Sequence, residues 1–113
     1  MAERFLRGLG YEVVARNWRC ATGELDLVAF QGDTLVFVEV RSRASGASYA
    51  PEETIGPVKR KRLVSAAEAY LDQSNWDGAG RFDVVAVDIR DTGTTARLFT
   101  DAFGADPDPG GAR

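Results

Sequence analysis

The sequence of 113 residues contains no histidine and only one cysteine, Cys20. The absence of histidine excludes Ser-His-Asp triads, Cys-His dyads, histidine-metal nucleases and most zinc sites. A single cysteine cannot form a disulfide within the chain, so a disulfide scaffold is excluded. The low cysteine content is consistent with a reducing cellular compartment. Any metal would be held by oxygen atoms, which favours Mg²⁺ or Mn²⁺.

Long apolar runs are also lacking. No apolar stretch approaches the ~20 residues of a membrane span, and the N-terminus has no signal-peptide core, so we expect a cytoplasmic protein with no membrane partner. The net charge of -3 argues against nucleic acid, whose binders are usually basic. Residues 59–62, however, are four consecutive cations. Contact with a phosphate backbone depends on such local positive charge and not on the net charge of the chain.

The residues that are present indicate one globular domain, with 44% hydrophobic and 27% charged positions. Hydrophobic spacing and turn residues predict the order α-β-β-β-α-β-β, an α/β (α+β) fold. The expected elements are a helix at 2–9, strands at 11–18, 24–31 and 34–41, a helix from 57 to about 74, and strands at 81–89 and 96–100. The second helix would cross over between strands three and four of one mixed sheet of about five strands, with flanking helices.

Two segments are expected to lie outside these elements. Residues 42–56 have no periodicity and predict a loop that is longer than most connections. Residues 104–113 are rich in Pro, Gly and Asp, which predicts a flexible acidic tail after a domain that spans residues 1–103.

The second and third strands predict a hairpin with Gly32 and Asp33 in its turn. In that register Asp26 faces Glu39, and Glu24 faces Arg41, all on one face of the sheet. Like charges directly opposite each other are destabilising, and a divalent cation between the two carboxylates would offset this repulsion. The pattern therefore predicts a metal site with Asp26 and Glu39 as ligands.

Such a site has a chemical consequence. A Mg²⁺ ion held by two carboxylates binds a scissile phosphate and lowers the pKa of a bound water. Arg41 would stabilise the charge that develops in the transition state. Because arginine stays protonated and cannot act as a base, activation of the water would come from the metal or from Glu24.

Four cationic side chains are candidates for binding nucleic acid. Lys59 and Arg62 lie on the predicted basic helix, where four cations in the first turn oppose the helix dipole and favour a phosphate partner. Arg43 falls in the predicted loop. Arg16 lies two residues before Trp18, and an arginine close to an aromatic ring suits nucleotide stacking. The alternatives are a solvated helix face for the cations and a core position for Trp18.

The sequences Gly-Glu-Leu-Asp-Leu at 23–27 and Phe-Val-Glu-Val-Arg at 37–41 resemble the acid-x(n)-E-x-K signature of restriction-endonuclease-like nucleases. More narrowly, residues 2–103 resemble the YraN-like family of small uncharacterised bacterial proteins, which are similar to archaeal Holliday-junction resolvases. Further matching segments are Gly-Tyr at 10–11, Ala-Arg-Asn-Trp-Arg at 15–19, Lys59, Arg-Leu at 62–63 and Arg-Phe-Asp-Val at 81–84.

The resemblance implies a restriction-endonuclease-like fold with Asp26 and Glu39 at the metal-ligand positions. Arg41 stands where the signature usually has lysine. Members of the family usually begin with a longer first helix that carries a Gly-Glu pair, so the first helix here is shortened relative to that pattern.

Three functions remain open at this point. The first is a Mg²⁺- or Mn²⁺-dependent phosphodiesterase that acts on nucleic acid, with DNA as the expected substrate. The second is a catalytically inactive nuclease-fold module that binds branched or structured nucleic acid. The third is an adaptor that binds protein through the loop at 42–56. The sequence leaves open the choice of DNA or RNA, turnover with Arg41, and whether the chain forms a homodimer.

Overall fold

The structure is a computed structural model that describes residues 1–44 and 55–103, except for the side chains at 43 and 44. The predicted tail at 104–113 and most of the predicted loop at 42–56 lie outside the described residues. The elements are α1 (Ala2–Gly8), β1 (Glu12–Cys20), β2 (Gly23–Gln31), β3 (Thr34–Ala44), α2 (Pro57–Ser74), β4 (Ala79–Arg90) and β5 (Gly93–Phe103). The predicted order α-β-β-β-α-β-β is confirmed.

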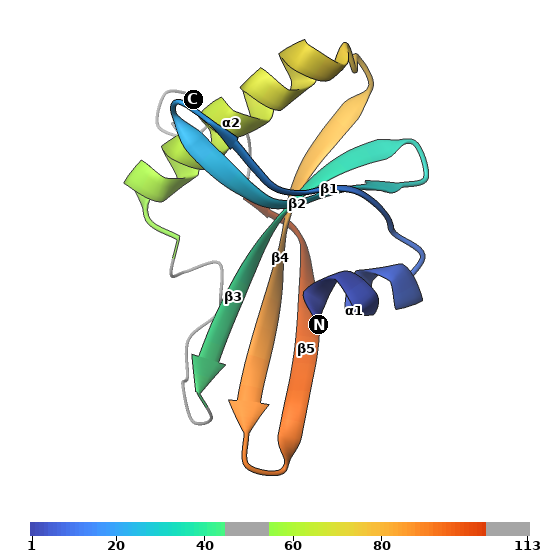
Figure 1. Ribbon diagram of the computed structural model, residues 1–113, viewed down its shortest axis with the longest axis vertical. Coiled ribbons are helices and arrows are strands. Elements are labelled where there is room, and N and C mark those ends of the chain that lie inside the picture. The colour runs from blue at the N-terminus through green and yellow to red at the C-terminus, as the bar shows by residue number, and fades with distance from the viewer. Residues whose placement is uncertain (45–54, 104–113) are drawn as a thin grey trace.

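The strands form one five-stranded sheet in the order β1-β2-β3-β4-β5. β3 and β4 are parallel, and the other neighbouring pairs are antiparallel. A parallel pair needs a crossover connection, and α2 provides it, as predicted. Figure 1 shows α2 across one end of the twisted sheet and α1 on its other side, beside β5. The mixed sheet with flanking helices is therefore confirmed.

The strands are longer than the sequence predicts, most of all β5. β3 continues to Ala44, so Arg43 lies in a strand and not in the predicted loop, with its backbone opposite Asp88 of β4. β5 runs from Gly93 to Phe103 because it pairs with β4 along most of its length. The additional strand segments are rich in polar residues, so local propensity does not predict them as strand. They form strand because they pair with the neighbouring strand.

The sheet has a hydrophobic cluster on each face. On the α2 side, Leu63, Ala66 and Ala67 of the helix pack against buried strand residues such as Phe37 and Val84. The other cluster lies beneath α1 and includes Leu6, Tyr11, Val13, Leu27, Val36, Val38, Val85 and Val87. Burial of these apolar surfaces is the main force that holds both helices on the sheet. Neither of the described helices is long and apolar enough to cross a membrane.

The apolar spacing of the second helix predicts one stripe that contains Val58, Leu63, Ala66, Ala67, Tyr70 and Leu71, and Val58 is an exception to it. Its side chain is 66% exposed, whereas Leu63 is buried. Five residues of helix separate the two positions, which is a rotation of roughly 140° around the axis. Val58 therefore lies on a different side of α2 from the core stripe.

A polar network lies within the α1-side cluster. The Asp83 side chain is fully buried and accepts hydrogen bonds from the Tyr11 hydroxyl at 2.8 Å, the Arg81 guanidinium and the backbone N–H of Asp101. Arg81 also donates to the Gln31 side chain at 2.6 Å. Burial and the hydrogen bond to Asp83 raise the pKa of Tyr11 to about 12. The network joins Tyr11, the residue before β1, with β2, β4 and β5, and it satisfies a carboxylate that would be costly to bury alone.

Candidate active site: an acidic pair beside a basic hollow

The β2–β3 hairpin brings the predicted site residues together. Gly32 has a φ of +58°, the positive value that the predicted turn requires. The backbone pairs run from Gln31–Thr34 to Leu27–Val38, in the predicted register. The hairpin thus fixes the two strand segments from which the acidic side chains project.

Asp26 lies where β2 separates from β3. Its Oδ2 accepts a hydrogen bond at 2.8 Å from the backbone N–H of Val40. In the described part of β2 and β3, the backbone ladder ends at Leu27 and Val38, so the predicted pairing of Asp26 with Glu39 is wrong as a backbone pairing. In a continued ladder, the Val40 N–H would donate to a backbone carbonyl of β2. Here it donates to the Asp26 carboxylate, so a side chain competes with the backbone for this donor.

The neighbouring strand bends at the same level. Asn17 of β1 has a positive φ of +49°. Arg16, before it, contacts Glu3 of α1, whereas Trp18, after it, packs in the α2-side cluster. Consecutive even positions of a regular strand would share a face, so the kink at Asn17 turns the rest of β1 toward α2. The end of the β1–β2 hairpin consequently lies against the helix (Figure 1).

Glu39 is the central group of the site. Its side chain is only 5% exposed, and Lys59 Nζ of α2 lies 2.8 Å from Glu39 Oε2. Arg41 Nη1 is 3.7 Å from the same oxygen, as a weaker second cation. Burial raises the pKa of Glu39, and the charge and hydrogen bond of the neighbouring Asp26 act in the same direction, while Lys59 opposes them.

The Asp26 and Glu39 carboxyl groups therefore converge, although their backbones do not pair. Carboxylate oxygens in a half-buried pair suit a hard divalent cation, and Mg²⁺ is commonly bound through one or two carboxylates, waters and substrate phosphate. Among the described residues, no group of three or more acidic, cysteine or histidine side chains could hold a metal. Asp26 and Glu39 could hold one only as a pair, with water and a substrate phosphate as the remaining ligands.

Three other predicted residues occupy different surroundings. Glu24 forms an ion pair at 3.6 Å with Arg19, so the expected pairing of Glu24 with Arg41 is wrong. Arg16 donates to Glu3 at 2.6 Å on the α1 side and does not join the acidic pair. The backbone of Arg43 lies in β3, and its side chain lies outside the described residues.

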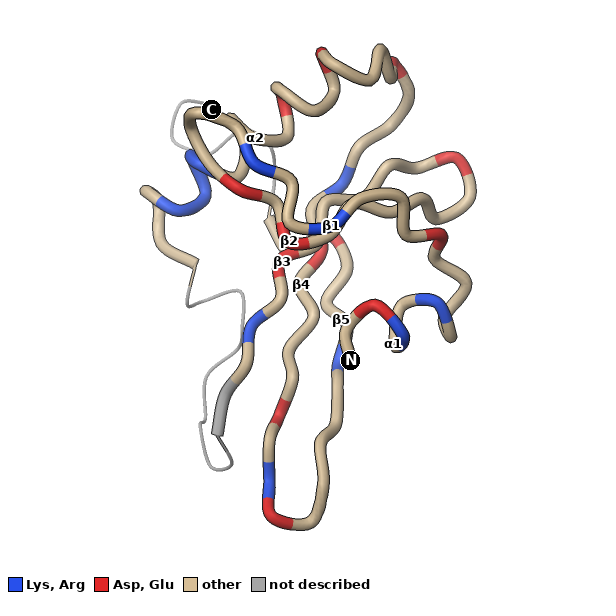
Figure 2. The backbone as a smooth tube through the Cα atoms, viewed as in Figure 1, with Lys and Arg blue, Asp and Glu red and all other residues tan. Residues whose placement is uncertain are grey.

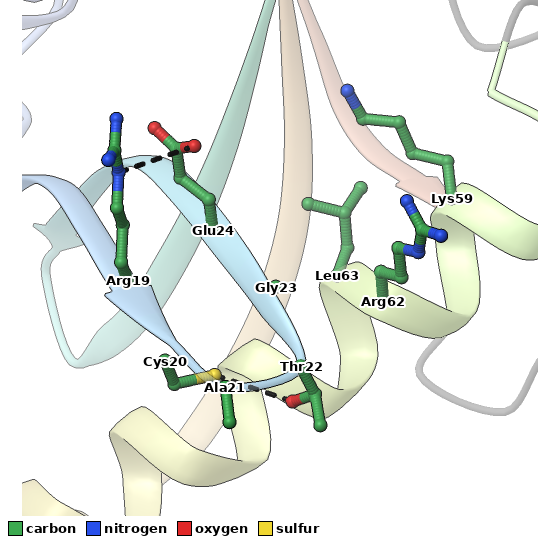
Figure 3. Close-up of a pocket in the computed structure, with 9 residues that line it drawn as sticks. All are labelled: Arg19, Cys20, Ala21, Thr22, Gly23, Glu24, Lys59, Arg62 and Leu63. Atoms are coloured by element: carbon green, nitrogen blue, oxygen red, sulfur yellow. Dashed lines mark hydrogen bonds and ion pairs between the residues drawn. The ribbon is translucent and has the colours of Figure 1, made fainter.

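Next to the acidic pair is an open hollow of about 820 Å³ between the β1–β2 turn and the first turns of α2. Figure 3 shows Arg19 and Glu24 on the strand side, facing Lys59 and Arg62 on the helix side. The turn itself contributes Thr22 and Gly23. Residues 19–24, 59, 62 and 63 line this space, which is called the hollow below.

The β1–β2 turn and α2 are in close contact where they form the wall of the hollow. A Cβ on Gly23 would lie 2.6 Å from the backbone oxygen of Arg62, so only glycine allows this approach of turn and helix. The Ser65 hydroxyl also donates a hydrogen bond to the Thr22 hydroxyl at 2.7 Å. These contacts fix the cations of α2 in relation to the β1–β2 turn. Figure 2 shows the basic residues gathered at the start of α2.

Sequence reasoning assigned Lys59 to nucleic acid but missed its contact with Glu39. It named Arg19 only within the matching segment 15–19, and it missed Thr22. Local sequence gave no signal for the contact between Lys59 and Glu39, because Glu39 lies in the middle of β3 and Lys59 reaches it only through the placement of α2. The position of Arg19 depends on the kink at Asn17, for which local sequence gave no signal.

Comparison with known proteins identifies the family. Residues 1–87 match the sequence model of "Uncharacterised protein family UPF0102". A UPF0102 protein of Anaeromyxobacter dehalogenans (strain 2CP-C) is 46% identical over 111 residues, covering 97% of this chain and 83% of the relative. One of Syntrophus aciditrophicus (strain SB) is 41% identical over 91% of this chain and 82% of its own length. One of Pseudomonas aeruginosa (strain LESB58) is 47% identical over 82% of this chain and 76% of its own length.

These matches confirm the resemblance to the YraN-like family, and the names of these relatives state no activity. The chain belongs to the uncharacterised protein family UPF0102.

Proposed function

We propose that this protein is a metal-dependent phosphodiesterase that cleaves nucleic acid, with DNA as the expected substrate. The observation that carries the proposal is the convergence of Asp26 and Glu39 in a half-buried site that Lys59 also reaches. Two carboxylates and a lysine ammonium can together hold a divalent cation and a phosphate group.

Asp26 and Glu39 would hold Mg²⁺ or Mn²⁺, and this cation, when bound, supplies positive charge to the phosphate under attack. Burial, and after it the charge of the neighbouring Asp26, raises the pKa of Glu39, so desolvation and mutual repulsion both disfavour the ionised pair. An additional cation is therefore favourable at this point. The hydrogen bond from Val40 holds Asp26 in place before a ligand arrives.

Lys59 and Arg41 would stabilise the phosphate. Lys59 is 49% exposed at its side chain and reaches the acidic pair from α2, so its ammonium can turn from Glu39 to a phosphate oxygen. Arg41 is fixed close to the same carboxylate on β3. Positive side chains at this distance favour the transition state of phosphoryl transfer because its charge spreads over the oxygens. Glu24 is 42% exposed and faces Arg19, which leaves it as the candidate to orient a water from the rim.

A second candidate function is an inactive nuclease-fold module that binds structured nucleic acid. Lys59 Nζ already lies 2.8 Å from Glu39, in the manner of an internal counter-ion, and Arg41 replaces the lysine of the signature. An arrangement of this kind retains phosphate binding without turnover. The two candidates make the same prediction for binding and opposite predictions for cleavage.

The test is a cleavage assay on linear and branched DNA and on RNA, with Mg²⁺, with Mn²⁺ and with EDTA. We expect cleavage with either metal, none with EDTA, and a loss of at least about 100-fold for Asp26→Asn or Glu39→Gln. Asp72→Asn, which neutralises an exposed carboxylate on α2, is the matched control and should cleave normally.

Metal binding is measured separately by thermal melting. A cation that binds only the folded state at 100 times its Kd stabilises it by about 2.7 kcal/mol. Stabilisation by Mn²⁺ that Asp26→Asn removes, without cleavage of any substrate, would replace the phosphodiesterase with the inactive module. An unchanged melting temperature at millimolar Mn²⁺ would overturn the metal site itself.

A further inference from the structure

We propose that the hollow binds the sugar–phosphate backbone of one nucleic-acid strand and leads it to the acidic pair without reading its bases. This inference rests on the proposed function and names the way in which its substrate is held. It concerns Arg19, Thr22 and Arg62 in addition to Lys59.

The charges of the hollow suit a phosphodiester. Three cationic side chains, Arg19, Lys59 and Arg62, line it together with one carboxylate, Glu24. Arg62 is exposed and makes no ion pair with any residue that the structure describes, so its guanidinium is available. The Arg19–Glu24 pair is exposed and 3.6 Å apart, and pairs of this kind contribute little stability. Arg19 can therefore turn to a phosphate at small cost.

The hollow is also a built feature of the fold. Its two walls are joined through the Thr22–Ser65 hydrogen bond and through the close approach of Gly23 to the α2 backbone. The backbone positions that carry the cations are consequently held at a fixed separation across an open space of about 820 Å³. This space is larger than a single phosphate group needs, and it suits a stretch of strand.

Lys59 connects the hollow with the acidic pair. The same side chain lines the hollow and places its ammonium 2.8 Å from Glu39. A strand whose phosphates follow Arg19 and Arg62 would thus meet Lys59 next and arrive beside Asp26 and Glu39. The path gives the exposed basic turn of α2 a function in substrate binding.

The lining explains why the bases would not be read. No aromatic ring is among the described residues that line the hollow. Trp18, the nearest aromatic residue in the sequence, packs edge-on against Tyr70 with ring centroids 5.3 Å apart, on the core side of β1. Base stacking usually requires an exposed ring, so contacts here are limited to phosphate and sugar. Binding should therefore be independent of sequence and strongly dependent on salt.

The experiment measures the anisotropy of fluorescein-labelled 20-nucleotide single strands in EDTA, so that neither cleavage nor metal affects binding. We expect oligo-dT, oligo-dA and a mixed sequence to bind with Kd values within about threefold of one another. Arg62→Gln and Arg19→Gln should each weaken binding of all three strands at least about fivefold, and each should lower the salt slope by about 0.7. Glu24→Gln should strengthen binding, because it removes the only carboxylate among the described residues that line the hollow.

The matched control is Lys61→Gln, which removes the same charge from the same turn of α2 at an exposed position outside the hollow. It should change Kd less than about twofold. Equal effects of Lys61→Gln and Arg62→Gln would overturn the proposal in favour of a diffuse basic helix. A sequence preference above tenfold, or equally tight binding of a poly-Glu peptide, would also overturn it.

The two proposals fail separately. Arg62 and Arg19 are exposed, so their Gln variants should fold, and circular dichroism melting verifies this. If they bind strands as wild type does while Asp26→Asn loses Mn²⁺ stabilisation, the hollow is wrong and the metal site stands. If the Gln variants lose strand binding while Mn²⁺ stabilises neither wild type nor any variant, the hollow stands and the phosphodiesterase is wrong.

Discussion

The Asp26 carboxylate accepts a hydrogen bond from the backbone N–H of Val40 at 2.8 Å, at the point where the β2–β3 ladder stops. One side chain thus has two functions, since it satisfies a strand donor and supplies half of the acidic pair. The two functions can be separated, because an amide oxygen can accept the same hydrogen bond but is a poor ligand for a hard cation.

Replacement of Asp26 should separate stability from metal binding. Asp26→Asn keeps an acceptor for Val40 and removes a negative charge beside Glu39, so its free energy of unfolding should equal or exceed that of wild type. Asp26→Ala leaves the Val40 N–H without its partner and should lose about 1–3 kcal/mol. Urea unfolding measures both variants. A destabilisation by Asn as large as that by Ala would show that the charge, and not the hydrogen bond, matters to the fold.

The hairpin shows how much of this site the sequence could predict. The Gly32–Asp33 turn fixes the register, and a period of two places the side chains, so the approach of Asp26 and Glu39 could be predicted from local pattern. The interruption of the ladder could not, because it depends on a side chain competing with the backbone for Val40. The contact of Lys59 with Glu39 is likewise tertiary and depends on the placement of α2.

The buried network of Asp83 should contribute strongly to stability. Asp83→Ala leaves Arg81 and the Asp101 N–H without their carboxylate, so we expect a loss of about 3 kcal/mol in the free energy of unfolding. Tyr11→Phe removes one hydrogen bond and should lose about 1 kcal/mol. The control Asp72→Ala removes an exposed carboxylate and should change stability by less than about 0.5 kcal/mol. Equal effects at positions 83 and 72 would contradict a stabilising network.

The attachment of α1 to β1 should depend on pH through Glu3. Hydrogen bonds from Arg16 and Arg7 lower the pKa of Glu3 to about 2, from the ordinary value of 4.5 for a glutamate. A carboxyl group whose pKa is lowered on folding adds stability above its unfolded pKa, and that stability is lost as the pH falls through the folded pKa. Wild type should therefore melt above Glu3→Gln at pH 7, and the difference should disappear near pH 2.

Salt provides the control for this prediction. The Glu3 ion pairs are partly exposed, so 1 M NaCl at pH 7 should reduce the difference in melting temperature between wild type and Glu3→Gln. A difference that is constant from pH 7 to pH 2 and in high salt would show that Glu3 acts through packing and not through its charge.

Gly23→Ala tests whether the close approach of the β1–β2 turn to α2 shapes the hollow. The new Cβ would lie 2.6 Å from the Arg62 backbone oxygen, and neither backbone can yield as a flexible side chain would. We expect a loss of about 1–3 kcal/mol in urea unfolding, together with weaker strand binding, because the turn and the cations of α2 move apart. Gly8→Ala is the matched control. Its Cβ would meet nothing within 4 Å, and Gly8 lies in α1 with no positive φ, so this variant should gain up to about 1 kcal/mol and bind strands as wild type does. If Gly23→Ala were as stable as wild type and bound strands equally well, the contact between turn and helix would have no part in forming the binding surface.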